Sequence, residues 1–177
     1  MSGWLRRRIR LTWALLAVGS ALALSLLWGT LLLATDHTRD AGMAAAAAAY
    51  DAAVHTRSTA LAAHGMHPVI WDVPPQAARD QLQVALVTET RFSEEVSRIA
   101  FPVSVHCDVS RVLAATEQVK AAELTLIQQS YAGQLTLEGK SAYLDTIAAW
   151  GSADYTLRQD LGLAARLPLV NWWPSYC

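Results

Sequence analysis

Residues 104–132 read SVHCDVSRVLAATEQVKAAELTLIQQSYA, and they carry the clearest structural pattern in the chain. The apolar side chains of this stretch mostly recur three, four or seven residues apart, at Val105, Val109, Val112, Val119, Leu126 and Ile127. Side chains at such intervals lie along one face of an α-helix. Gly133 follows directly, and glycine commonly ends helices. The stretch therefore predicts a long helix with one buried face.

Helical patterns also lie on both sides of this stretch. Pro75 suits the first turn of a helix, and this helix must end before Pro102, because proline disfavours helical geometry in the residue ahead of it. Thr136 is a candidate N-cap for a further helix, which Gly162 or Pro168 would end. The apolar positions of these two helices are Ala78, Leu82, Leu86, Phe92, Val96 and Ile99, and Tyr143, Leu144, Ile147, Ala148, Trp150, Tyr155 and Leu161. No alternating pattern with hairpin turns accompanies them, so a sheet is not expected.

An alanine-rich segment precedes these patterns. It contains an unbroken alanine run over 44–49, and alanine is the best helix former. Such a helix buries little area by itself, so it requires a neighbour to pack against. Gly65 and Pro68 then mark a break in the chain.

Charge divides the sequence more sharply than its totals of 14 basic and 15 acidic residues suggest. Four arginines lie within the first ten residues, and residues 11–35 carry no formal charge. From Asp36 onward, 10 basic residues face all 15 acidic ones, a net charge of −5. An uncharged apolar stretch of this length is long enough to span a bilayer, and the arginines keep its N-terminal side in the cytoplasm. The open alternative is a cleaved signal peptide with the small residue Ala34 near its end.

The fold class expected from these patterns is all-α, a single N-terminal transmembrane helix followed by an extracytoplasmic helical bundle or long helical hairpin. The expected segments are a basic cytoplasmic N-terminus (1–10), a transmembrane helix (11–35), an Ala-rich helical stalk (36–67) and an extracytoplasmic helical domain with an aromatic C-terminal tail (68–177). The expected location is the cytoplasmic (inner) membrane, with the bulk of the chain on the periplasmic side.

Small residues recur every four positions within the expected span, at Ala17, Ala21, Ser25 and Gly29. Small residues on one face let transmembrane helices approach closely, so this face would contact another membrane protein or a second copy of the chain. The alternative is chance, since small residues are common in such segments.

The chain has two cysteines, Cys107 and Cys177. Outside the cytoplasm they could form an intramolecular disulfide that ties the tail to the start of the helix over 104–132. A bridge from Cys177 to another chain and two free thiols are the alternatives. The C-terminal tail, just before Cys177, holds Trp172, Trp173 and Tyr176. These rings would either cover the core of the bundle or contact a partner.

Motifs for chemistry are scarce. The sequence has no GxSxG, HExxH, CxxC or glycine-rich phosphate loop, so we expect neither an enzyme nor a bound cofactor. His64, Met66 and His67 are the compact metal-ligand candidates, of a type that suits copper, and the alternative is a polar loop between two helices. A nucleic-acid partner is not expected, because the formal net charge is only −1.

A set of residues within 108–162 is spaced as in a known helical hairpin, namely Glu123, Tyr131, Gly133, Tyr143, Leu144, Tyr155, Leu161 and Gly162. With these residues the segment resembles the helical hairpin of outer-membrane efflux factors of the TolC type. In that family a long helix ends near a Tyr-x-x-Gly segment and the next helix runs to a closing glycine. The resemblance implies a helix–turn–helix and no efflux function, because the β-barrel of that family has no counterpart here and the family lacks an inner-membrane anchor.

Three functional hypotheses follow. The first is a non-catalytic accessory or scaffold subunit of a bacterial-type envelope membrane complex, which contacts partners through the span and the outer helical domain. The second is a phage-type inner-membrane spanin, a class with one N-terminal span and a helical outer segment. The third is an extracytoplasmic ligand-sensing domain.

Overall fold

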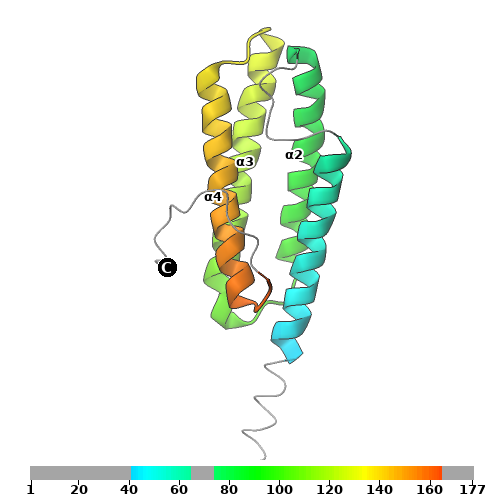
Figure 1. The fold of residues 1–177 in the computed structure, drawn as a ribbon, viewed down its shortest axis with the longest axis vertical. Coiled ribbons are helices and arrows are strands. Elements are labelled where there is room, and N and C mark those ends of the chain that lie inside the picture. Colours follow the sequence, from blue (N-terminus) through cyan, green and yellow to red (C-terminus); the bar gives the residue numbers. More distant parts are fainter. Residues whose placement is uncertain (1–40, 65–73, 165–177) are drawn as a thin grey trace, which may run out of the picture. The chain divides into compact units, whose positions relative to one another are not determined.

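The computed structural model describes residues 41–64 and 74–164, which form helices joined by turns (Figure 1). A helix covers residues 41–63, and it is followed by α2 (Pro75–Ser97), the 3-10 helix η1 (Val103–Val105), α3 (His106–Tyr131) and α4 (Leu137–Asp160). The chain divides into two units, Met1–Ala41 and Gly42–Cys177, and the helices compared below lie in the second. The all-α expectation is confirmed for the described part of the chain.

The expected fold class requires one correction. None of the helices within 41–64 and 74–164 is long and apolar enough to cross a membrane. The segment expected to do so, 11–35, lies outside the described residues, and so does its small-residue face at Ala17, Ala21, Ser25 and Gly29. The fold class is therefore an all-α bundle with no assigned membrane helix.

The ends of the helices follow from local chemistry. Pro75 is the first residue of α2, where its missing N–H and fixed φ suit the first turn. The Thr136 hydroxyl accepts a hydrogen bond from the Gly139 N–H at 3.0 Å and caps α4. Gly133 and Gly162 follow α3 and α4 with φ of 74° and 70°, a left-handed conformation that glycine adopts without strain.

Pairwise contacts close the four longer helices around one interior. α3 packs against both α2 and α4. The helix over 41–63 is joined to α2 by Arg57 and Glu89, and to α4 by Tyr50, whose hydroxyl donates to Asp154 at 2.7 Å. Figure 1 shows these helices side by side along a common direction. The alanine-rich segment is therefore one wall of a four-helix bundle.

Small and large side chains alternate in the interior. Ala46, Ala47 and Ala53 are buried on the alanine-rich helix, which lets its neighbours approach, while Tyr50 on the same face is fully buried. The Tyr50 ring lies 6.4 Å from that of Phe92, and Phe92 lies 5.8 Å from the ring of Trp150. Aromatic contacts at these separations stabilise beyond the area that they bury. The rings thus connect three of the helices at one level of the bundle.

Candidate functional site: a buried charge cluster

Three of the buried charged side chains interact with one another, and each lies on a different helix. Arg57 on the helix over 41–63 is 7% exposed, Glu89 on α2 is 1% exposed, and Glu123 on α3 is 0% exposed. Charged residues are almost never this buried unless they are paired, because removing a charge from water is costly. We call Arg57, Glu89 and Glu123, with Tyr143 of α4, the core cluster.

Arg57 and Glu89 form the paired part of the core cluster. The Arg57 Nε donates to both carboxylate oxygens of Glu89, at 2.9 Å and 2.8 Å, and its Nη2 donates to Oε1. The guanidinium also lies 3.7 Å from the centre of the Trp150 ring and 5.5 Å from that of Phe92. Hydrogen bonds and two ring faces thus surround the cation, which is the environment that arginine tolerates best when it is buried.

Glu123 is the unpaired part. Neither of its carboxylate oxygens has a hydrogen-bond partner among the described residues. Burial, and secondarily the negative charge of Glu89, raises the pKa of the Glu123 carboxyl to about 8, although Arg57 and Lys120 act in the opposite direction. At neutral pH the protonated, uncharged form of Glu123 is therefore favoured.

The two buried tyrosines are held in the uncharged form as well. Burial, then the charges of Glu123 and Glu89, raises the pKa of Tyr143 above its usual value. Burial is also the main cause that raises the pKa of Tyr50, with the charge and hydrogen bond of Asp154 adding to it. Both hydroxyls remain neutral proton donors over the physiological pH range.

A second ionic contact lies between the alanine-rich helix and α4. Arg158 of α4 is buried and its Nη2 lies 2.8 Å from Oδ1 of Asp51. Asp51 Oδ1 accepts no hydrogen bond from the described residues, so the contact with Arg158 is an ion pair. The Arg158 Nε donates to the Ala164 carbonyl at 3.1 Å, which ties the end of α4 to the segment after it.

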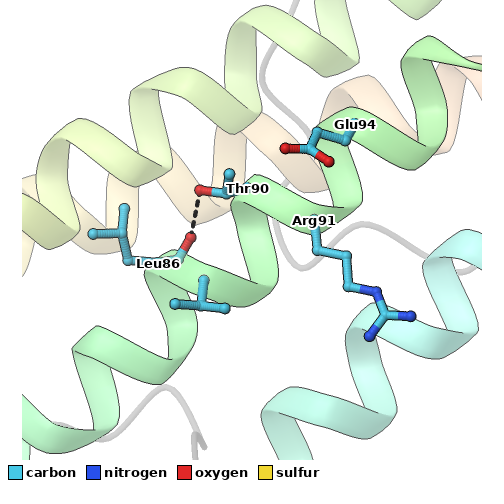
Figure 2. A pocket seen from close by; sticks show the side chains of 5 residues that line it. Leu86, Thr90, Arg91 and Glu94 are labelled. Carbon is cyan, nitrogen blue, oxygen red and sulfur yellow. Dashed lines mark hydrogen bonds between the residues drawn. The ribbon is translucent and has the colours of Figure 1, made fainter.

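The outer face of α2 carries a separate feature, a pocket of about 370 Å³. It is lined by Leu86, Val87, Thr90, Arg91 and Glu94. Figure 2 shows Arg91 and Glu94 extending in different directions from α2, and the Thr90 hydroxyl donating to the Leu86 carbonyl, a bond of 2.8 Å. We call these five residues the α2 pocket.

Of the three predicted metal ligands, His64 lies within the described residues and the other two do not. His64 is exposed just after the helix over 41–63, with Nδ1 2.9 Å from the Ala60 carbonyl oxygen. Met66 and His67 lie outside the described residues. Within 41–64 and 74–164, no three His, Cys, Asp or Glu side chains group closely enough to hold a metal ion.

The predictions for the cysteines and for the aromatic tail concern residues both inside and outside the described part of the chain. Cys107 is half-buried in the first turn of α3, and no free cysteine occurs among the residues that the structure describes. Cys177, Trp172, Trp173 and Tyr176 lie outside those residues. The pairing of Cys107 with Cys177 and the role of the aromatic tail stay predictions.

The sequence patterns did not identify the core cluster, although the positions of its two glutamates relative to apolar residues indicate that they are buried. Glu89 is seven residues from both Leu82 and Val96, and Glu123 lies between Val119 and Leu126. Both glutamates therefore occupy positions of the apolar stripe. A charged residue at such a position indicates a buried partner, but the sequence does not show which one.

No protein-family model, curated protein or solved structure matches this chain. Residues 108–162 contain two helices joined by a turn, α3 and α4, but nothing bears on the resemblance to TolC-type efflux factors.

Proposed function

We propose that the protein is a non-catalytic accessory or scaffold subunit whose helical bundle binds another protein through the α2 pocket. The observation that carries this proposal is the exposure of Val87, which is 69% exposed on the outer face of α2 and lines the pocket there. An exposed aliphatic residue alone is ordinary, but an apolar side chain next to a concave surface with a charged rim has the composition of an interface centre.

The chemistry of the α2 pocket selects the kind of partner. Leu86 and Val87 supply the apolar part of the lining, while the exposed Arg91 and Glu94 place one charge of each sign at the rim. An amphipathic helix of the partner, with one aliphatic or aromatic side chain directed into the pocket and charged residues beside it, complements this surface. The rim charges are accessible, because their ion pairs with Glu95 and Arg98 lie on the surface and contribute little stability.

The test compares two valine-to-aspartate variants of the full chain. Val87→Asp places a charge in the pocket, whereas Val103→Asp places it in η1, at a position that is also exposed, by 82%. The tagged chain is captured in mild detergent from the cells that produce it, and the proteins that accompany it are quantified by mass spectrometry.

We expect Val87→Asp to reduce the recovery of a specific partner by about tenfold or more, since a charge at an interface centre is strongly unfavourable. Val103→Asp is expected to leave the recovery unchanged. Circular dichroism of both variants should show the helix content of the wild type. Equal recovery from both variants, or recovery of the wild-type chain only as a monomer or homodimer, contradicts the proposal.

A further inference from the structure

We propose that the interior of the bundle is a proton-binding site, in which the closed bundle holds one proton on Glu123 and loses stability when that proton leaves. This inference concerns the core cluster and is independent of the α2 pocket.

The geometry of the core cluster leaves one carboxylate without a counter-charge. Arg57 is the cation of the core cluster, and its Nε and Nη2 are directed to Glu89. Glu123 is fully buried, and neither of its oxygens has a hydrogen-bond partner among residues 41–64 and 74–164. With both glutamates ionised, the three charges sum to a net negative charge in a region of low dielectric, whereas one bound proton makes the cluster neutral.

Titratable groups on each neighbouring helix surround Glu123, and the charged ones among them shift its pKa. Glu89 of α2 opposes its ionisation, and Arg57 of the alanine-rich helix favours it. Lys120, on α3 itself, also favours it, but this ammonium is partly exposed and hydrogen-bonds Glu117 at 2.9 Å. Tyr143 of α4 is uncharged and cannot balance a carboxylate. Because burial is the largest effect, the proton is favoured over the charge.

The direction of the pH dependence follows from the two pKa values. The Glu123 pKa is about 8 in the folded bundle against about 4.5 for an ordinary glutamate, so the folded state binds more protons between these values. Stability contributed by this proton is fully present below pH 4.5 and is lost as the pH rises through 8. The bundle should therefore be tighter in an acidic environment than in an alkaline one.

The experiment is denaturant unfolding of the purified full chain between pH 5 and pH 9, with two variants. Glu123→Gln mimics the protonated side chain at every pH. Glu117→Gln is the matched control, since Glu117 lies on the same helix with its side chain 61% exposed. Taking the ratio of each variant to the wild type removes the contributions of other groups, such as Asp160, whose pKa is raised by partial burial and by Asp108.

For Glu123→Gln, the folding equilibrium constant relative to that of the wild type should rise about tenfold per pH unit between pH 5 and pH 7.5. For Glu117→Gln the ratio should stay constant. A ratio that does not change with pH for Glu123→Gln overturns the proposal.

A second measurement uses the wild-type chain alone and does not require any variant to fold. In the wild-type chain labelled with ¹³C at the glutamate carboxyls, one carboxyl resonance should titrate with a midpoint near pH 8. If every glutamate carboxyl titrates below about pH 6, the bundle has no such proton site and the proposal is wrong.

Discussion

The Arg57→Met variant is expected to be less stable than the wild type by about 3–5 kcal/mol. Arg57 donates three hydrogen bonds to Glu89 inside the bundle, from Nε and Nη2. Methionine retains much of the apolar stem but leaves the Glu89 carboxylate buried without its cation. The variant also loses the contacts of the guanidinium with Trp150 and Phe92. Denaturant unfolding at pH 7, followed by circular dichroism, measures the loss.

Arg91→Met is the control for this substitution. Arg91 lies on α2 two residues after Glu89, but its side chain is 71% exposed and pairs with Glu95 on the surface. Solvent screens such a pair, so the loss should be within about 0.5 kcal/mol. If the two arginine variants lose equal stability, Arg57 does not occupy the buried position described here.

The Phe92→Ala variant should lose a similar amount, about 3–5 kcal/mol. Its ring is buried and lies 6.4 Å from the Tyr50 ring and 5.8 Å from the Trp150 ring, so it connects α2 to two other helices. Alanine leaves a cavity that these rings cannot fill without moving, and it removes one face of the Arg57 environment. The free energy of unfolding from denaturant titration at pH 7 measures this effect.

Phe101→Ala provides the comparison at the edge of the same group of rings. Phe101 contacts the Tyr50 ring at 6.2 Å but is only partly buried, in the segment between α2 and η1. The Phe101→Ala variant should lose clearly less stability than Phe92→Ala, because the space left at the partly buried position can collapse or fill with water. If Phe101→Ala loses more stability than Phe92→Ala, Phe92 is not the centre of the aromatic contacts.

The sequence predicts the helices well and their partners poorly. The apolar stripe of α3, the cap at Thr136 and the stops at Gly133 and Gly162 depend on neighbours within a few residues, so local patterns reveal them. The pairing of Arg57 with Glu89 joins side chains 32 positions apart, and no local pattern encodes that distance. The candidate site was missed for this reason.

The alanine-rich segment illustrates the same limit. Its composition predicts a helix that requires a neighbour, and the helix over 41–63 has two of them, α2 and α4. The sequence alone favoured a stalk that continues a membrane helix, because no proline interrupts residues 11–67. The burial of Arg57 and its pairing with Glu89 place this helix in the bundle, and neither can be read from local sequence.

The measurement that tests the bundle most directly is a double-mutant cycle on Arg57 and Glu89, with Arg57→Met, Glu89→Gln and the two combined. The central claim is that these side chains pair in the interior and join the alanine-rich helix to α2. Each single variant removes one partner of the pair and leaves the other, whereas the double variant removes both, so their effects should not add. We predict a coupling free energy of about 2 kcal/mol or more. Effects that add within about 0.5 kcal/mol would contradict the claim, because independent sites behave in this way.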